Sequence, residues 1–223
     1  MDYSKAFKMV KDSVVMIKNG NGTGTGSIVG DGTLILTCHH CVFPINNLSV
    51  EHPFLKTSKT ATILSSDQAS DIALLKIDSK IGAPISLESN LPSIGEETFA
   101  LGFPYGINEI VLLPALIASI PNTSMFRLNS SINHGNSGGP LINHFGKQIG
   151  IVNAKHGSLS AFLDKMENSG AGVSVNFGGF DPIGSVQQLI KEMRYNLNLG
   201  IGYAIPIHKL NSLGSVFSSL LTS

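Results

Sequence analysis

Residues 135–141 read GNSGGPL and set one serine, Ser137, among three glycines and a proline. Glycine lets the backbone adopt positive φ and approach another group closely. A serine hydroxyl is a poor nucleophile near neutral pH, so a reactive serine needs a base for its proton and donors for the oxyanion that it creates. The pattern G-x-S-G-G-P arises by chance at roughly 10⁻⁶ per position, or on the order of 10⁻⁴ in a chain of this length. The stretch therefore predicts a sharp turn that presents a reactive serine.

The remainder of the chain has the pattern of short β-strands. Glycine accounts for 24 of the 223 residues, there is no tryptophan, and short Val/Ile/Leu runs alternate with Gly, Pro, Asn and Ser. This pattern is typical of an all-β protein, and the length suits one large domain or two small ones. The spacing gives two sets of about six short strands. We therefore predict two small antiparallel β-barrels.

Charge is sparse and balanced, with 15 Lys+Arg against 15 Asp+Glu and 13% charged residues in all. Because no basic cluster is present, we expect neither a nucleic acid nor an anionic membrane surface as a partner. The first 30 residues contain no apolar signal-peptide core and no run long enough to span a bilayer. The sequence thus predicts a cytoplasmic protein.

Helices are expected at the two ends of the chain. Tyr3, Phe7 and Val10 recur at helical spacing and predict a short helix that packs on the body of the protein. Residues 209–223 predict a closing amphipathic helix. Its apolar side would consist of Leu210, Leu213, Phe217, Leu220 and Leu221.

A run of four potential ligands follows the β-rich residues 33–37: Cys38, His39, His40 and Cys41. A CxxC pair is half of many zinc sites and also serves as a redox dithiol. Four consecutive residues do not converge easily on one tetrahedral ion, and no second cysteine pair completes the usual spacing. We therefore favour a general base for Ser137 at one of the two histidines, with a metal site and a redox dithiol as alternatives. Two cysteines three residues apart also exclude a long-range disulfide framework.

Asp71 precedes the apolar strand IALLKI of residues 72–77. An unpaired carboxylate at the mouth of a buried strand is costly, so Asp71 needs a hydrogen-bonding partner. A histidine N–H is a natural one. The more polar surroundings of Asp67 and Asp78 indicate ordinary turn residues.

Several segments resemble the chymotrypsin-like (trypsin-like) serine proteases, most closely the HtrA/Deg branch. Residues 37–42 (TCHHCV) are similar to that family's T-x-x-H-x-V segment, and residues 70–77 (SDIALLKI) to its Asp-bearing strand. Residues 132–141 (INHGNSGGPL) resemble its nucleophile turn, I-N-x-G-N-S-G-G. Two further similar segments lie at residues 93–106 and 200–206.

The resemblance implies a serine endopeptidase that works through an acyl-enzyme, with His40 as base, Asp71 as its partner and Ser137 as nucleophile. It places the oxyanion hole at the backbone of Gly135, Asn136 and Ser137, and implies a polypeptide substrate and neither a cofactor nor a metal. It also implies an N-terminal barrel over about 13–90 and a C-terminal barrel over about 93–208 of one protease domain covering residues 1–223. The substrate-binding walls would be Ser131, Ile132, Asn153, Ala154, Lys155, Gly202 and Tyr203. An alternative is a protease-fold binding or chaperone module that is inactive or needs a partner for activation.

The sequence departs from the family most clearly at residues 155–199, where the family usually has far fewer residues. Asp181 and Pro182 suit the N-cap and first position of a helix there. Such an insertion either packs on its own barrel or forms a cap, a homo-oligomer contact or a partner-binding element beside the cleft. The sequence continues for 17 residues after Pro206 (223 − 206), so we expect a protease domain without the PDZ module that commonly follows in HtrA proteins.

Overall fold

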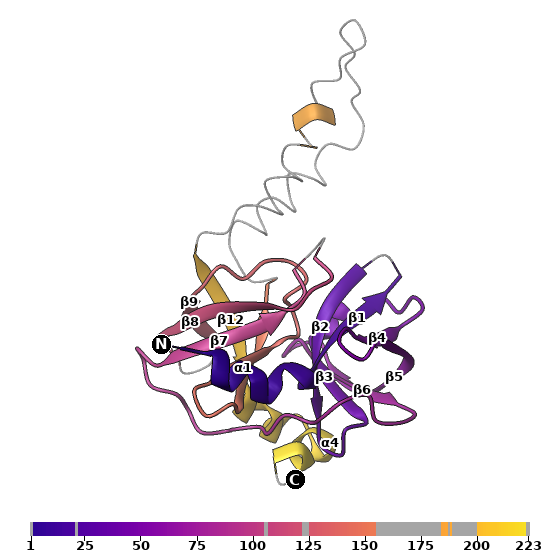
Figure 1. Cartoon of the computed structure of the whole chain (residues 1–223), viewed down its shortest axis with the longest axis horizontal. Helices are drawn as coiled ribbons and strands as arrows, with labels where there is room; N and C mark the ends of the chain where they lie inside the picture. Colours follow the sequence, from indigo (N-terminus) through magenta and orange to yellow (C-terminus); the bar gives the residue numbers. More distant parts are fainter. Residues whose placement is uncertain are drawn as a thin grey trace, which may run out of the picture.

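Two closed antiparallel barrels of six strands each form the described part of this computed structural model, with strand orders β1-β2-β3-β6-β5-β4 and β10-β11-β12-β9-β8-β7 (Figure 1). The structure describes residues 2–20, 22–104, 107–121, 125–154, 184–186, 188 and 200–221. The predicted all-β class and the two six-stranded barrels are confirmed. No helix among these residues has the length and apolar character to cross a membrane.

The strands of the first barrel lie within residues 14–77. They are β1 (Val14–Asn19), β2 (Gly22–Val29), β3 (Leu34–Thr37), β4 (Ser49–His52), β5 (Thr57–Asp67) and β6 (Ile72–Ile77). The strands of the second barrel are β7 (Glu97–Gly102), β8 (Val111–Ser119), β9 (Phe126–Asn129), β10 (Pro140–Asn143), β11 (Gln148–Asn153) and β12 (Ile201–Pro206).

The strands that adjoin the other barrel are apolar on both faces because both faces are buried. In β6, Ala73 and Leu75 fill the interior of the first barrel, whereas Ile72 and Leu74 join a larger cluster between the barrels. The same alternation with a period of two separates Ile35 from Leu36 in β3. This explains why these segments read as continuous apolar runs.

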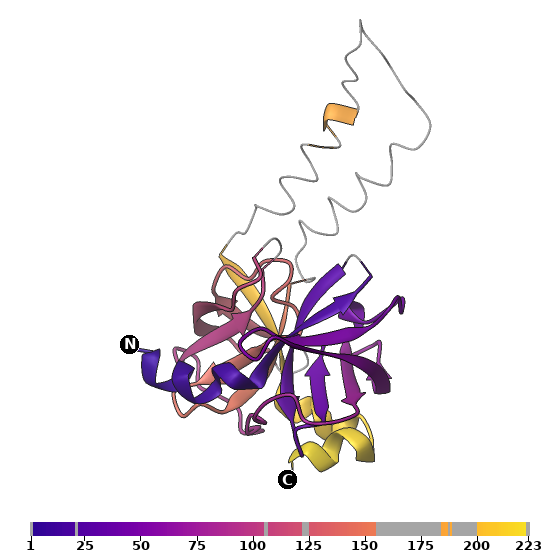
Figure 2. The same ribbon diagram turned by 45° about the vertical axis from the view of Figure 1, so that its right-hand side comes forward.

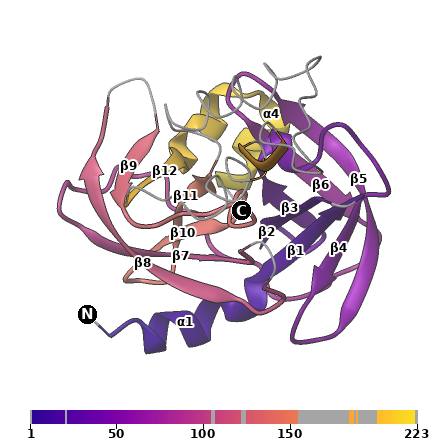
Figure 3. The ribbon, with the colours of Figure 1, turned by 90° about the horizontal axis from the view of Figure 1, so that it is seen from above.

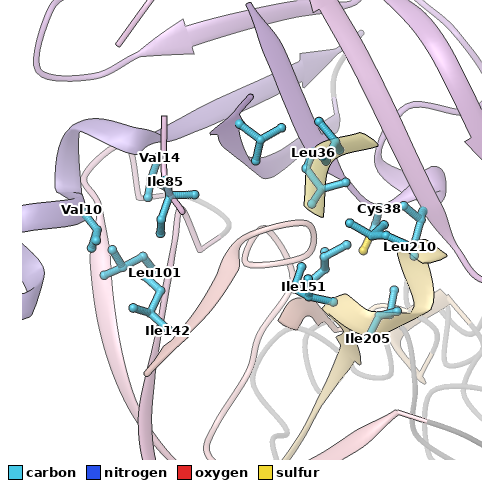
Figure 4. Close-up of a cluster of buried hydrophobic side chains, with 14 of the residues drawn as sticks. Val10, Val14, Leu36, Cys38, Ile85, Leu101, Ile142, Ile151, Ile205 and Leu210 are labelled. Carbon is cyan, nitrogen blue, oxygen red and sulfur yellow. The ribbon is translucent and has the colours of Figure 1, made fainter. Parts of the chain in front are cut away.

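The cluster between the barrels unites them into one body. It includes Leu36 of the first barrel with Leu101 and Ile151 of the second, and all are nearly inaccessible to solvent. Figure 4 shows these side chains together with Val10 of the N-terminal helix and Cys38, whose sulfur points into the cluster beside Leu210.

Short helices close the body at both ends of the chain. The N-terminal helix α1 (Ser4–Val10) continues into the 3₁₀ turn η1 (Lys11–Ser13) and lies along the second barrel's side of the molecule (Figures 1 and 3). At the other end, η3 (Ile207–Ser212), α4 (Ser215–Ser218) and η4 (Ser219–Leu221) lie beneath the first barrel (Figure 2). The prediction of one continuous closing helix over 209–223 is therefore wrong, because the segment forms three short helical pieces. Gly214, with φ of 98°, breaks it into separate pieces.

Two strands contain residues that usually disfavour a strand. The glycine-rich residues 22–26 form the first part of β2 and pair with β1. Pro114 does not interrupt β8, because β9 pairs with β8 only from Leu116 onward. At Pro114 the strand has a single neighbour, so the missing N–H leaves no ladder bond unmade.

The expected insertion at 155–199 lies almost wholly outside the described residues. Residues 184–186 and 188 are described and are helical, in agreement with a helix that starts after Asp181 and Pro182. Whether the insertion caps the cleft or binds a partner stays a prediction.

Candidate active site

His40 and Asp71 meet at the ends of two neighbouring strands. Because β3 and β6 are antiparallel with Thr37 opposite Ala73, the same register carried two residues further brings Asp71 opposite the turn η2 (His39–Cys41). The Nδ1 atom of His40 lies 2.7 Å from Oδ2 of Asp71, and the His40 backbone N–H donates to Oδ1 at 2.9 Å. The predicted pairing of His40, rather than His39, with Asp71 agrees with this geometry.

Asp71 is held in place from several directions. Its backbone has φ of 56°, a left-handed conformation that aspartate tolerates better than most residues. Its carbonyl accepts the His39 N–H at 3.1 Å, and Nδ2 of the fully buried Asn153 donates to its Oδ2 at 2.7 Å. Burial raises the pKa of Asp71, but the hydrogen bonds and charge of His40 outweigh burial and hold that pKa below its usual range. The carboxylate is therefore ionised at neutral pH.

Charge from two neighbours controls the protonation of His40. Burial lowers the pKa of His40, but hydrogen bonds to Asp71 and Cys41, together with their negative charge, outweigh it and raise the pKa to about 9. His39, in contrast, stacks on Phe43 with ring centroids 4.3 Å apart. His39 therefore packs against the loop that follows η2.

The turn that carries Ser137 is fastened to the first barrel by β2. The backbone N–H of Thr25 donates to the Ser137 carbonyl at 2.8 Å, and the Thr25 hydroxyl donates to the Gly135 carbonyl at 2.7 Å. The same hydroxyl accepts the Phe103 N–H at 3.0 Å, while the Thr37 hydroxyl donates to the Thr25 carbonyl at 2.7 Å. A buried threonine in one barrel thus fixes two carbonyl groups of the nucleophile turn in the other.

Glycine is needed in this turn because of that close contact. A Cβ at Gly138 would lie 2.1 Å from both the Thr25 carbonyl oxygen and Oγ1 of Thr37, and the residue has φ of +85°. A Cβ at Gly139 would lie 2.2 Å from the Leu101 carbonyl oxygen. Contact between the barrels therefore requires glycine at position 138, and contact with β7 of the same barrel requires it at position 139.

Two backbone donors of the turn have no hydrogen-bond acceptor among the described residues. Within the described residues, the N–H groups of Gly135 and Ser137 make no hydrogen bond, and Gly135 has φ of +91°. The N–H of Asn136 donates to the Asn133 carbonyl at 3.1 Å, so it does not join them. Of the three predicted donors, the N–H of Asn136 is thus already bonded, whereas those of Gly135 and Ser137 are not.

The Ser137 hydroxyl accepts a hydrogen bond from the Ala154 N–H at 3.0 Å. Among the described residues no hydrogen bond joins Ser137 Oγ to His40. Ser137 and His40 nevertheless line one pocket of about 460 Å³ between the barrels. From the first barrel and its loops this pocket is lined by Asn19, Gly22, Thr23, His40, Cys41, Phe43, Pro44 and Asn46, and from the second by His134, Gly135 and Ser137.

The predicted substrate-binding walls are only partly brought together. Ile132 packs against Gly202, where a Cβ would come within 2.5 Å of its Cγ1, and Ala154 lies next to Ser137. Ser131 is exposed and Tyr203 is half-buried. Asn153 was expected in a wall, but it is fully buried and bonded to Asp71, which corrects its role. Lys155 lies outside the described residues.

The sequence did not predict the contacts of Thr25 and Thr37 with the site. It also did not predict that Cys41 lies next to Ser137. The Cys41 sulfur lies 3.4 Å from the Ser137 carbonyl oxygen. Among the remaining histidines, His52 has a structural role, since its Nε2 lies 3.0 Å from the Asp12 carbonyl oxygen. His134 lines the pocket, and His156 lies outside the described residues.

One group of potential metal ligands lies inside the site. A donor atom from each of Cys38, His40 and Asp71 falls within 4.8 Å of the others. His40 Nδ1 and Asp71 Oδ2 are already bonded to each other, so an ion would have to replace that bond.

Comparison with known proteins assigns the family. The model of the trypsin-like peptidase domain matches residues 24–151, more than half of the chain. The chain belongs to the trypsin-like peptidase family. The magnetosome formation protease MamE of Paramagnetospirillum magneticum is 31% identical over 151 residues, which cover 62% of this chain and 21% of that protein. A probable periplasmic serine endoprotease, DegP-like, of Hahella chejuensis is 33% identical over 141 residues, covering 60% and 30%.

Among solved structures, the serine endoprotease from Yersinia pestis matches this trypsin-like chain with a TM-score of 0.71 and 24% identity, over 100% of this chain and 68% of that one. This likeness shows the trypsin-like fold. The chain spans about a fifth to a third of the length of the two curated relatives.

Proposed function

We propose that this trypsin-like chain is a serine endopeptidase that cleaves peptide bonds through an acyl-enzyme. The observation that carries the proposal is the 2.7 Å pair of His40 with Asp71, together with the pocket that His40 and Ser137 both line. Because Nδ1 of His40 faces the Asp71 carboxylate, Nδ1 carries the proton and Nε2 is left to accept one. That is the tautomer that a general base for a serine requires.

Each step of the reaction has a residue that suits it. Nε2 of His40 takes the Ser137 proton while Oγ attacks the peptide carbonyl, and the N–H groups of Gly135 and Ser137 bind the resulting oxyanion. His40 then returns the proton to the leaving amine, and a water molecule releases the acyl group by the same steps in the second half. Asp71 stabilises the charged imidazole in each transition state, and Asn153 holds Asp71 in place.

The bond between Ser137 Oγ and the Ala154 N–H has to be given up for attack on substrate. A neutral hydrogen bond of this kind contributes about 0.5–1.5 kcal/mol net. Because 1.36 kcal/mol corresponds to a tenfold change in rate, rotation of the hydroxyl toward His40 costs about tenfold or less. The resting position of Ser137 is thus compatible with turnover.

The described wall residues also suggest a substrate preference. Ile132, Ala154 and Gly202 are apolar, and none of these residues offers a carboxylate to a basic side chain. We propose a small or medium apolar residue on the acyl side of the cleaved bond. A peptide library with all residue types at that position measures the preference directly, and selective cleavage after Lys or Arg would contradict it.

The proposed activity is tested on a chemically unfolded protein as substrate. Cleavage products are identified by mass spectrometry for the wild type, Ser137→Ala and the matched control Ser58→Ala, which changes an exposed serine on β5. Cleavage by the wild type and by Ser58→Ala, with none by Ser137→Ala, supports the proposal. Equal cleavage by Ser137→Ala would reject it.

The second candidate is a binding module that is idle until a partner acts on it. The position of Ser137, bonded to Ala154 rather than to His40, favours this alternative. It predicts that the wild-type protein binds unfolded polypeptide in a pull-down or fluorescence titration while neither cleaving it nor reacting with serine-directed probes.

A further inference from the structure

Two cysteines stand on either side of His40 in one tight turn. Cys38 precedes η2, Cys41 ends it, and the Cys41 N–H donates to the Cys38 carbonyl at 3.2 Å. A turn closed in this way brings the two Cα atoms within about 7 Å. A disulfide spans Cα separations of about 4.4–6.8 Å. Both thiols are free. The turn can therefore accept a bond between them.

The two thiols differ in access and in chemistry. Cys41 lines the pocket beside Ser137, whereas Cys38 is completely buried in the cluster between the barrels, where Figure 4 shows its sulfur. A hydrogen bond from Cys38, supported by His40 and opposed by burial, lowers the pKa of Cys41 to about 6. Burial raises the pKa of Cys38 well above its usual range. Cys41 is thus partly exposed at the pocket, and Cys38 is protected and close by.

We propose that Cys38 and Cys41 form a peroxide-sensitive dithiol that closes into a disulfide and displaces His40. The Cys41 thiolate attacks a hydroperoxide, ROOH, and the O–O bond breaks to give a sulfenic acid on Cys41 and the alkoxide RO⁻, which takes up a proton. The Cys38 thiol then attacks the sulfenic sulfur and releases water, the Cys38 proton leaving with the hydroxide. Two thiols are oxidised, and ROOH is reduced to ROH and H₂O. An external dithiol reverses the change by thiol–disulfide exchange.

Closing this bond changes the surroundings of the proposed base. The Cys41 thiol leaves the Ser137 carbonyl, and the Cys38 thiol leaves the Val152 carbonyl, each of which it contacts at 3.4 Å. His40 lies between the two cysteines, so its backbone moves with the turn, and the negative charge of Cys41 beside its imidazole disappears. The loss of hydrolysis that follows rests on the proposed function, whereas the disulfide and the altered titration of His40 do not.

The experiment treats the chelator-washed protein with hydrogen peroxide and then with dithiothreitol. Free thiols are alkylated and located by mass spectrometry, His40 is titrated by NMR, and peptide hydrolysis is followed in parallel. We expect the treated wild type to lose both alkylatable thiols and two hydrogen atoms, and the pKa of His40 to fall. Above pH 9, where His40 is neutral in both states, we also expect hydrolysis to drop by roughly tenfold or more because His40 is displaced, and dithiothreitol to restore all three.

Two variants separate the role of Cys41 as the attacking thiol from that of Cys38 as the resolving thiol. Each variant is compared with its own untreated sample. Cys38→Ala should stop at a sulfenic acid that a dimedone probe traps, because the resolving thiol is missing, and Cys41→Ala should keep Cys38 reduced. A wild type that keeps both thiols free, or that forms the disulfide with His40 unchanged, would overturn the proposal. Stoichiometric zinc that blocks both thiols in the protein as isolated would also overturn it. Disulfide formation and the His40 change without hydrolysis in either state would reject only the proposed function.

Discussion

Replacing Thr25 by valine tests how far the first barrel organises the nucleophile turn. Valine has nearly the same shape but lacks the hydroxyl, which donates to the Gly135 carbonyl at 2.7 Å and accepts the Phe103 N–H at 3.0 Å. Both partners are buried, and a buried group that loses its hydrogen bond costs about 1–3 kcal/mol. Thr25→Val should therefore lower the free energy of unfolding by at least about 2 kcal/mol, as measured by urea denaturation.

The same variant should impair the chemistry, since the peptide that follows Gly135 is no longer held. Loss of one oxyanion donor costs about 10²–10³ in kcat. We expect the rate of reaction with a fluorophosphonate probe to fall by about tenfold to 10³-fold. Thr60→Val, at an exposed position on β5, is the matched control and should change the stability by no more than about 0.5 kcal/mol. An unchanged labelling rate with the expected loss of stability would refute the role of Thr25 in the site.

Three further predictions follow from the contacts in the site. Because only neutral His40 accepts a proton, and its pKa is raised to about 9, kcat/KM should increase with pH from the ordinary histidine value of 6.5 up to about 9. A plateau already reached below pH 7 would contradict this. Asn153→Leu removes a hydrogen bond to the charged Asp71 and should cost about 1.5–3 kcal/mol in urea unfolding, so an unchanged midpoint would show that the bond is dispensable. Gly138→Ala should destabilise the protein far more than Gly95→Ala. Both glycines have positive φ, but a Cβ at Gly95 meets nothing within 4 Å, and equal thermal shifts would rule out the clash.

Local pattern was sufficient for the barrels and for the need of Asp71 for a histidine partner, whereas the choice of His40 over His39 came from the resemblance to the protease family. The apolar run at 72–77 has the length and composition of a buried strand, and an aspartate at its start needs a partner wherever the strand goes. The antiparallel register of β3 and β6 then supplies that partner at His40. These features depend on neighbours along the chain or on adjacent strands, so the sequence pattern reveals them.

The contacts between the barrels could not be predicted in this way. Thr25 lies in a glycine-rich stretch that resembles a turn, and it is buried only because residues 110 positions later fold over it. Asn153 ends a strand and was expected at the surface of the pocket, yet its amide points to Asp71, 82 residues away in the other barrel. The break in the predicted C-terminal helix has a local cause in Gly214. In the sequence, the apolar periodicity on both sides of this glycine favoured one continuous helix.

The central claim is that Ser137 is a nucleophile activated by His40. The most direct test is covalent labelling of the intact protein by a fluorophosphonate, followed by mass spectrometry of the labelled peptide. We predict one label per chain, located on Ser137, absent in Ser137→Ala and formed at least about 100-fold more slowly in His40→Ala, because a general base contributes about 10²–10⁴ to the rate. A wild-type protein that remains unlabelled, or that is labelled at the same rate without His40, would contradict the account.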